Sequence, residues 1–365
     1  MSKILISGYY GFSNAGDEAM LTAIIEALRA ERRDVEITVL SGKPEITAEK
    51  HGVRSIHRFS GWSIFKAMLD TDLLLSGGGS LLQDVTSKKS LLYYLSIIML
   101  AKLLGRKVML YAQGIGPIRS SFARSLTKYV CRKANLITVR DDGSYEELKE
   151  MGLPGDRIIV TADAVFSLSA ERKDIGRQIL LDNGFSGEKP MIGIALRHWP
   201  GEKRFTKVFA EVAMTLRKQY NARIVFVALQ FPADTQIAEK TASLMDNSED
   251  VIILREGYTT EEYVSIIGNL DLLIGMRLHA LVFAALAGVP FLAVSYDPKV
   301  DRCVKGMEGV AAGSIESITA EDIIKESSKL WQQVPQRQNE KIQALHIEAR
   351  RNSARAIGLL GKSKK

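Results

Sequence analysis

The sequence predicts an α/β protein built from two doubly wound domains. Short apolar runs rich in β-branched residues alternate with longer amphipathic ones, a pattern typical of parallel sheets wrapped by helices. The pattern starts again after a charged, glycine-containing stretch at 169–190, and 365 residues are too many for one ordinary core. We therefore expect domains at 1–170 and 186–345, followed by a C-terminal helix and basic tail at 346–365.

Each predicted domain has its own series of strands. In the first half we expect strands at 3–7, 36–40, 73–75, 107–112, 136–139 and 158–161. In the second half we expect them at 191–196, 222–228, 251–254, 272–274 and 291–294. The junction carries one short helical segment around 178–182. Ligands of open parallel sheets bind beyond the carboxyl ends of the strands, so we expect the site in these loops and in a cleft between the domains.

Composition places the chain among soluble globular proteins, with 46% hydrophobic and 25% charged residues. A formal net charge of +7 suits an anionic partner, and nucleic acid, a membrane surface or a phosphorylated substrate would all fit. The N-terminus has no secretory signal pattern, and Cys131 and Cys303 lack the spacing of a metal site. We expect a cytoplasmic protein with reduced cysteines that pack in the fold.

The longest apolar stretch, at 91–104, falls short of the roughly 20 residues that span a bilayer. Ser96 and Lys102 interrupt it, so we expect a buried helix. The C-terminal GKSKK is expected to be a solvated tail.

The loop after the first strand reads GYYGFSNAGDE and matches neither a dinucleotide fingerprint nor a P-loop. Asn14 can cap the following helix, with Asp17 and Glu18 in its first turn, where the helix dipole favours carboxylates. If the loop also binds a ligand, its carboxylates would repel phosphate, and a neutral sugar hydroxyl is the better candidate.

Two further loops of the first half carry candidate ligand-binding residues. The turn SGGGS places Gly78 and Gly79 after a strand, where backbone N–H groups can approach a ligand, although tight turning also explains the glycines. Arg140 precedes Asp141 at another strand end, which fits either a surface ion pair or an oxyanion ligand.

The second half holds a sharper combination of residues. Arg277 and His279 lie where a predicted strand gives way to a helix N-terminus, and Lys299 follows the next strand. Neighbouring parallel strands would bring these side chains to one edge, forming a site for a small, multiply charged anion with one proton shuttle. The chain has no HExxH, clustered Asp pair or GxSxG, so we expect neither a metal nor a serine nucleophile.

These loops resemble the polysaccharide pyruvyl transferase family. The shared segments, in the family's order over nearly the whole chain, are GYYGFSNAGDEAML, SGGGSLLQD, AQGIGP, VRD, TADAVF and GMRLHALVFAALAGVP. The resemblance implies a GT-B-like architecture of two Rossmann-like domains, with phosphoenolpyruvate as co-substrate and no other cofactor. It also implies a lipid-diphosphate-linked acceptor, an N-acetylmannosamine in the secondary cell-wall polymer that anchors surface-layer proteins.

The resemblance carries site roles over to this sequence. The implied donor-binding residues are Arg140, Arg277 and Lys299. The implied catalytic residues are His279 and Arg277. The expected acceptor-binding residues are Asn14, Asp17, Glu18, Gly78 and Gly79.

The residues alone are also compatible with two other functions. Another GT-B enzyme, a glycosyltransferase or nucleotide-sugar epimerase, would need an acidic residue for the ribose, such as Asp297 or Asp301. A basic nucleic-acid-binding protein is the second, but we see no Lys/Arg stripe interleaved with aromatics. We expect no nucleic-acid partner, and peripheral binding to the anionic inner face of the cell membrane.

Overall fold

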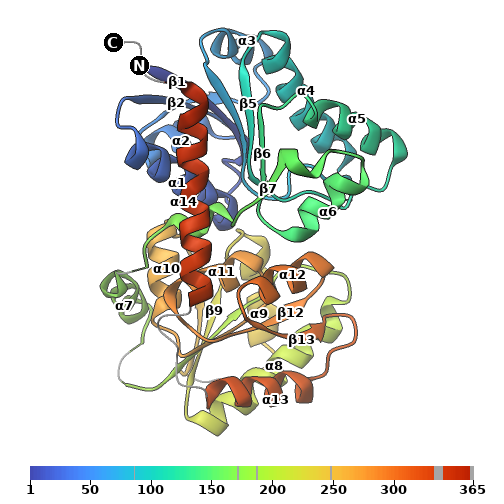
Figure 1. Ribbon diagram of the computed structural model, residues 1–365. Coiled ribbons are helices and arrows are strands. Elements are labelled where there is room, and N and C mark those ends of the chain that lie inside the picture. The colour runs from blue at the N-terminus through green and yellow to red at the C-terminus, as the bar shows by residue number, and fades with distance from the viewer. Residues whose placement is uncertain (86, 171, 186–187, 247–248, 333–339, 362–365) are drawn as a thin grey trace. The chain divides into compact units, whose positions relative to one another are not determined.

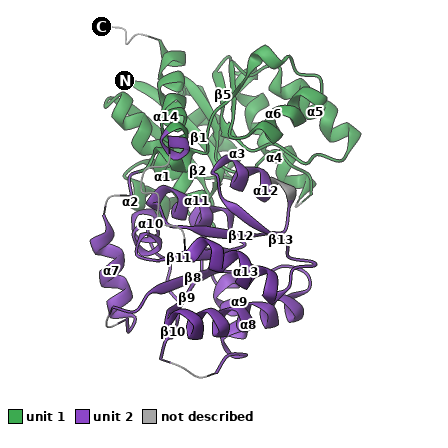
Figure 2. Cartoon of the chain, turned by 60° about the horizontal axis from the view of Figure 1, so that its bottom comes forward, with its two compact units in different colours: residues 1–12, 17–168, 344–365 green, residues 13–16, 169–343 purple. Residues whose placement is uncertain are grey.

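A computed structural model describes residues 1–85, 87–170, 172–185, 188–246, 249–332 and 340–361. The chain divides into two compact units (Figure 2). Unit 1 comprises Met1–Phe12, Asp17–Leu168 and Ala344–Lys365; unit 2 comprises Ser13–Gly16 and Ser169–Gln343. Each unit has its own parallel sheet, so the predicted α/β class with two doubly wound sheets is confirmed.

Unit 1 contains a parallel sheet of seven strands within the described residues, in the order β3-β2-β1-β4-β5-β6-β7 (Figure 1). The strands are β1 Ser2–Tyr10, β2 Val35–Ser41, β3 Arg54–His57, β4 Leu73–Gly77, β5 Lys107–Gln113, β6 Leu136–Val139 and β7 Ile158–Val160. The chain order reverses between β1 and β4, which is the switch point of a doubly wound sheet. The loops that follow β1 and β4 therefore lie where doubly wound sheets bind their ligands.

The helices of unit 1 lie on the two faces of this sheet. They are α1 Ala15–Glu31, α2 Pro44–His51, α3 Gly61–Leu69, α4 Lys88–Leu103, α5 Ser121–Cys131, α6 Asp142–Glu150, η1 Gly155–Arg157, η2 Ala164–Ser167 and α14 Glu340–Leu360. Buried side chains of α3, α4, α5 and α6 share one core cluster with the sheet, so these four helices cover the same face. The C-terminal part of α14 joins unit 1, where Asn352 donates to the Thr161 hydroxyl over 3.1 Å.

Unit 2 repeats the architecture with six strands among its described residues, in the order β10-β9-β8-β11-β12-β13. The strands are β8 Met191–Ala195, β9 Arg223–Val227, β10 Val251–Leu254, β11 Leu272–Gly275, β12 Phe291–Ser295 and β13 Val310–Ser314. The helices are α7 Lys173–Asp182, α8 Glu202–Tyr220, α9 Ala233–Ala242, α10 Thr260–Gly268, α11 Leu278–Ala287, α12 Pro298–Gly306 and α13 Ala320–Trp331. Here the switch lies between β8 and β11.

Every strand expected from an apolar run is present, with ends shifted by up to three residues. Two strands were not expected, β3 and β13, and each is the outer strand of its sheet. Neither contains a fully buried residue. Because an edge strand does not need a continuous apolar run, its sequence does not stand out.

The expected buried helix at 91–104 is a helix, α4, but it is not buried on all sides. Leu92 and Leu103 are exposed, the latter by 77%. The prediction was wrong on this point because one side of α4 packs on the sheet and the other faces outward, although both sides carry leucines. The tail after Gly361 lies outside the described residues.

Candidate active site

The N-terminus of α11 lies at the carboxyl end of β11 in unit 2. Arg277 is the N-cap residue of α11, with extended backbone angles, and His279 is the second residue of the helix. Gly275 pairs with Ala195 of β8, which lies beside β11 in the middle of the sheet. The structure therefore brings Arg277 and His279 together at the edge where the sequence placed them.

The guanidinium of Arg277 is held by the β9–α9 loop and the first turn of α9. Its Nε donates to Asp234 Oδ2 over 2.8 Å, and its Nη2 donates to Gln230 Oε1 over 2.9 Å and to Asp234 Oδ1. Asp234 is 1% exposed and also accepts from the backbone N–H groups of Leu229 and Gln230. Arg277 is thus oriented by a buried carboxylate, and its Nη1 makes no hydrogen bond within the described residues.

The loop that begins α1 also belongs to unit 2, and it meets the same residues. Asn14 forms an isolated β-bridge with Gln230, and the Ala15 N–H donates to Leu229 O over 2.8 Å. A Cβ added to Gly16 would lie 2.1 Å from His279 Nδ1, so the imidazole packs directly on the Gly16 backbone. The expected acceptor residue Asn14 therefore lies in one cluster with Arg277 and His279.

Asn14 also caps α1, as the sequence predicted. Its Oδ1 accepts from the N–H of Gly16, the second residue of the helix, over 3.0 Å. The cap fixes the Gly16 backbone against which His279 rests. The cap and the site therefore depend on the same residue.

Arg197 is a cation at this edge that the sequence reasoning missed. It follows β8 by two residues, as Arg277 follows β11, and those strands pair Ala195 with Gly275. Its guanidinium carbon lies 4.2 Å from the ring centroid of Tyr296 and 5.2 Å from that of Trp199. Within the described part of the chain, Arg197 has no carboxylate partner, and its buried Nε has no hydrogen bond. The signal was available, since Arg197 directly follows a predicted strand.

Lys299 is the second residue of α12, the helix that follows β12. The backbone thus places it after the strand that neighbours β11, as expected. Its side chain lies outside the described residues.

Arg140 of unit 1 has a different environment. Its side chain is buried, and it joins the loops after β4, β6 and β7: Nη1 donates to Asp163 over 2.9 Å and Nη2 to Ser80 over 3.2 Å. Its Nε lies 3.5 Å from Asp141, whose other oxygen caps α6. The alternative of a surface ion pair is therefore wrong, because the ion pair is buried.

The glycine turn after β4 packs against the start of α1. Gly78 and Gly79 have positive φ values of 86° and 57°, which side chains rarely adopt. A Cβ on Gly79 would lie 3.1 Å from Asp17 Oδ1, and the Gly79 N–H donates to the Met20 sulfur. The structure therefore brings the predicted acceptor residues Asp17, Gly78 and Gly79 together within unit 1.

Glu18, the remaining predicted acceptor residue, is held by its own unit. Its Oε1 accepts from the Gly11 N–H over 2.8 Å, and its Oε2 lies 3.6 Å from His51 Nε2. Burial opposes ionisation of this carboxyl, but His51 and the Gly11 N–H outweigh it and lower the pKa of Glu18. These contacts indicate that Glu18 fixes the loop after β1.

A second missed arginine lies at the carboxyl end of β1. Arg58 is 4% exposed, and its Nη1 donates to Gly8 O over 3.3 Å. Its guanidinium carbon lies within 6 Å of the ring centroids of Tyr9, Phe12, Phe59, Tyr93 and Tyr94. No carboxylate of the described chain pairs with Arg58. Its charge is held by aromatic faces and hydrogen bonds instead.

Comparison with known proteins identifies the family. A family model described as polysaccharide pyruvyl transferase matches residues 14–298. This chain belongs to the polysaccharide pyruvyl transferase family. The matched range includes both the cluster around Arg277 and the Arg140 network, so the resemblance seen in the motifs is confirmed.

A curated relative places the family in polysaccharide biosynthesis. The chain is 22% identical over 353 residues to the amylovoran biosynthesis protein AmsJ of Erwinia amylovora, covering 81% of this chain and 84% of the relative.

Solved structures with the same fold include UDP-GlcNAc 2-epimerases. The enzyme from Methanocaldococcus jannaschii superposes with a TM-score of 0.71 at 15% identity, covering 98% of this chain and 99% of that one. The enzyme from Neisseria meningitidis, bound to UDP-GlcNAc, gives 0.65 at 13% identity over 98% and 99%. At such identities the likeness shows the fold alone, which confirms the GT-B-like class.

The described residues contain neither a metal-binding cluster nor a helix able to span a membrane. No group of three or more His, Cys, Asp or Glu lies close enough together to hold a metal ion. No helix in these residues is both long enough and apolar enough to cross a membrane.

Proposed function

We propose that this protein transfers the pyruvyl group of phosphoenolpyruvate to a sugar as a ketal and releases phosphate. The acceptor we propose is an N-acetylmannosamine of a lipid-diphosphate-linked disaccharide in cell-wall polymer synthesis. The observation that supports it best is in unit 2, where Arg197 and Arg277 follow paired strand ends beside His279 at a helix N-terminus.

The charge at this edge suits the donor. Phosphoenolpyruvate carries a phosphate and a carboxylate, and the arginine fork binds such oxyanions through paired hydrogen bonds. Asp234 balances one cation and orients Arg277, whereas Arg197 packs on Tyr296 and Trp199 and pairs with no carboxylate of the described residues. Arg197 therefore supplies net positive charge, and Arg277 is held in a fixed direction. Lys299 remains a predicted donor ligand.

Ketal formation needs two sugar hydroxyls and one proton transfer to carbon. The donor methylene carbon takes a proton and becomes a methyl group while the first hydroxyl oxygen bonds to C2. The second hydroxyl oxygen then displaces phosphate from C2. One hydroxyl proton replaces the proton given to carbon, and the other leaves with hydrogen phosphate, so atoms and charge balance.

His279 is the group we propose for the proton transfer. Imidazole titrates near neutral pH and can give a proton to carbon and regain one from a hydroxyl. Its packing on Gly16 fixes the ring beside the N-terminus of α11, where the helix dipole favours a bound anion.

The deciding experiment measures phosphate release from phosphoenolpyruvate with and without a glycolipid carrying N-acetylmannosamine. We expect release only with the acceptor, together with an acceptor product whose mass has gained one pyruvyl ketal. Release of phosphate without acceptor, or an unmodified acceptor, would refute the proposal.

Two further arms separate this function from nucleotide-sugar chemistry. With a strong chelator present we expect full activity, because no group of three or more His, Cys, Asp or Glu among the described residues could hold a metal ion. With UDP-GlcNAc in place of phosphoenolpyruvate we expect no change in the sugar. Loss of activity on chelation with recovery on Mg²⁺, or epimerisation of UDP-GlcNAc, would favour the alternative enzyme class.

A further inference from the structure

The charges of unit 1 are unevenly distributed along the sequence. The chain contains 42 Asp and Glu residues, yet none lies between Asp84 and Asp141. The same stretch holds the basic residues Lys88, Lys89, Lys102, Arg106, Lys107, Arg119, Arg124, Lys128, Arg132, Lys133 and Arg140. The modest overall charge of +7 therefore conceals a strongly basic region that includes α4 and α5.

Helices α3, α4 and α5 turn one continuous side outward. Their buried residues pack in one cluster on one face of the sheet, and α4 lies against both α3 and α5. The opposite sides of these helices therefore form a single surface, which we call the α3–α5 face. Figure 1 shows the three helices side by side.

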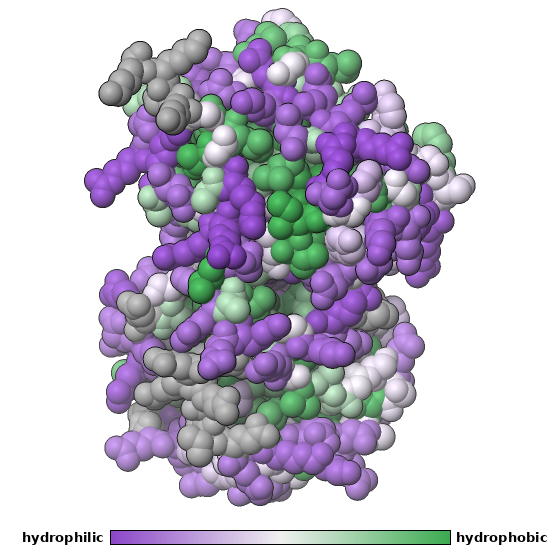
Figure 3. All heavy atoms as spheres, in the orientation of Figure 1, coloured by the Kyte–Doolittle hydropathy of each residue, from purple (hydrophilic) through white to green (hydrophobic). Residues whose placement is uncertain are grey.

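Large apolar side chains project from the α3–α5 face. They are Phe59, Trp62, Leu69, Leu92, Leu103, Phe122 and Tyr129, of which Trp62 is 67% and Phe122 70% exposed. Within each helix they recur at helical spacing, as at Trp62 and Leu69 of α3. At the top of Figure 3, where Figure 1 places α3, hydrophobic side chains reach the surface.

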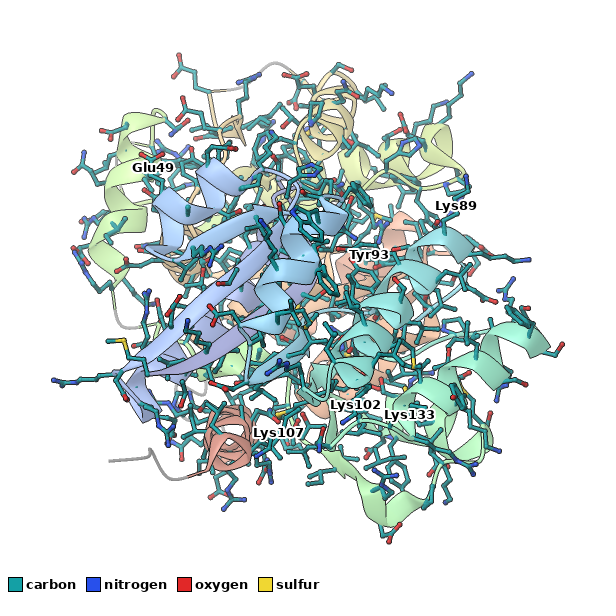
Figure 4. The ribbon with its side chains drawn as sticks, turned by 90° about the horizontal axis from the view of Figure 1, so that it is seen from above. Glu49, Lys89, Tyr93, Lys102, Lys107 and Lys133 are labelled. Atoms are coloured by element: carbon teal, nitrogen blue, oxygen red, sulfur yellow. The ribbon has the colours of Figure 1, made fainter. Side chains whose placement is uncertain are left out.

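Basic residues surround these apolar groups. Lys66 Nζ lies 5.1 Å from the Trp62 ring centroid, and Lys133 Nζ lies 4.7 Å from that of Tyr129. Figure 4 shows Lys89 and Tyr93 towards one end of α4, with Lys102 and Lys133 near the other. Burial and the nearby Lys133 both lower the pKa of Lys102, as expected where like charges gather.

Carboxylates begin again only at α6. There Glu147 lies 2.6 Å from Arg124 Nη1, and Glu150 lies 3.6 Å from Arg124 Nη2. Against the effect of burial, the nearby Lys88 helps to lower the pKa of the Asp84 carboxyl. Lys102 donates to Asn135 Oδ1 over 2.9 Å, and within the described residues no salt bridge joins Lys89 or Lys102 to a carboxylate. The α3–α5 face thus combines exposed aromatic and aliphatic side chains with an excess of lysines.

We propose that the α3–α5 face docks on the surface of an anionic lipid bilayer. Interfacial binding uses Trp, Phe and Leu that insert at the headgroup boundary, and Lys that attract anionic headgroups. A duplex nucleic acid would use the lysines but would leave Leu92 and Leu103 without an apolar partner. The inference rests on the proposed function only in that a lipid-linked acceptor gives such docking a purpose.

Binding is tested by sedimentation of the full chain with vesicles of phosphatidylglycerol and phosphatidylcholine. We expect binding at low salt, release at high salt and little binding to phosphatidylcholine alone. Each basic residue near an anionic surface contributes enough that Lys88→Glu/Lys89→Glu should weaken partitioning by about thirtyfold or more. Trp62→Ser/Phe122→Ser should weaken partitioning by about tenfold, because two exposed aromatic side chains of this face are removed.

Two matched controls use exposed residues of unit 2. Lys203→Glu/Lys207→Glu makes the same charge change on α8, and Leu244→Ser removes an apolar side chain that is also exposed. Both should bind vesicles within about twofold of the parent chain. Equal losses in the controls and in the α3–α5 variants would mean that net charge alone governs binding, which would overturn the proposal.

Fluorescence gives a second readout that does not depend on partitioning. If Trp62 enters the headgroup region, its emission shifts to shorter wavelength on vesicle binding, and brominated lipid quenches it. Trp62→Phe should still bind but lose most of this change, because Trp199 and Trp331 lie in unit 2. Binding without any change in Trp62 emission, or tighter binding to duplex DNA than to vesicles, would refute the docking surface.

Failure of the docking proposal is distinguishable from failure of the proposed function. With a water-soluble acceptor, Trp62→Ser/Phe122→Ser should retain the parent rate of phosphate release, whereas with a vesicle-embedded acceptor it should lose about tenfold. Normal vesicle binding without ketal formation would refute only the enzyme reaction. Equal rates of parent and variant on the embedded acceptor would refute only the docking role.

Discussion

The arginines at the two sheet edges have opposite electrostatic environments. In unit 1, Arg140 is buried between Asp163 and Asp141, and its charge is balanced inside the protein. In unit 2, Arg277 pairs with one carboxylate, that of Asp234. Arg197 packs on aromatic rings and has no carboxylate partner among the described residues. Two sheets of similar topology therefore place the same residue type in different electrostatic environments.

The difference indicates which edge is prepared for an anionic ligand. A buried arginine with two carboxylates gains little from a third anion and would lose its bonds to the loops that it joins. An arginine over aromatic faces keeps its hydrogen-bonding capacity for a ligand. Our proposal is therefore that Arg140 positions the loops of unit 1 and that the positive charge of unit 2 binds the donor.

The largest effect is expected at His279. His279→Gln should lower kcat by about 10²–10⁴-fold and change the apparent affinity for phosphoenolpyruvate far less, because a proton shuttle acts in the transition state. Steady-state kinetics and thermal melts on the same preparation test this. A destabilised variant with normal turnover would make His279 a structural residue and move the search to Asp17 and Glu18.

Gly16 offers a way to displace this ring without changing its chemistry. Gly16→Ala should also lower kcat, since the new Cβ would lie 2.1 Å from His279 Nδ1 and would push the ring aside. Gly358→Ala is the matched control, a helical glycine with no neighbour within 4 Å of an added Cβ. Full activity of Gly16→Ala would show that the position of the ring is not critical.

The next effect concerns stability in unit 1. Arg140→Met should lower the free energy of unfolding by about 3–5 kcal/mol, because it leaves the buried carboxylate of Asp163 without its partner. Urea unfolding of Arg140→Met, Asp163→Asn and the double variant should show clear non-additivity. If Arg140→Met is stable but raises the donor KM, the comparison between the two edges is wrong and Arg140 is a donor ligand.

The sequence predicted the two sheets well because inner parallel strands need continuous apolar runs, as in β4 and β11. The edge strands β3 and β13 were missed because neither contains a fully buried residue, so neither has a continuous apolar run. The outward face of α4 was also missed, because Leu92 and Leu103 look the same in sequence whether they pack on a sheet or face outward. Only the charge pattern from Asp84 to Asp141 hints at it, and the overall charge hides that pattern.

The site was predictable in its loops but not in its pairings. Strand ends located Arg277 and His279 at one edge of the second sheet, since topology alone brings such loops together. Asn14 was expected in the first domain, but residues 13–16 belong to unit 2. That Asp234 holds Arg277 could not be read from the sequence, because the two residues are 43 positions apart and many carboxylates were possible partners. Arg197 was overlooked because no motif surrounds it, although it follows a predicted strand.

A smaller effect is expected at Arg197. Arg197→Met should raise the donor KM by roughly ten- to a hundredfold, as one charge-assisted hydrogen bond is worth about 1.5–3 kcal/mol. Stability should change little, since no carboxylate is left behind. Arg255→Met is the control, because Arg255 is an exposed arginine of unit 2 paired with Glu239. An unchanged donor KM would remove Arg197 from the proposed site.

The smallest effect is the pH dependence that Glu18 gives to unit 1. Its pKa is lowered in the folded protein, so its ionised form adds stability above the pKa of the unfolded chain, near 4.5, and this is lost as pH falls through the lower folded pKa. Glu18→Gln should therefore be less stable than the parent by about 1 kcal/mol at neutral pH, and the gap should close below pH 4.5. Urea unfolding across this range measures the gap, and other carboxylates cancel because both proteins contain them.

The control is Glu49→Gln, at an exposed glutamate on α2, which should show no such gap. A gap for Glu18→Gln that stays constant with pH would mean that its carboxylate charge is not what holds the loop after β1, and the contrast with the ligand-binding edge of unit 2 would then rest on Arg140 alone.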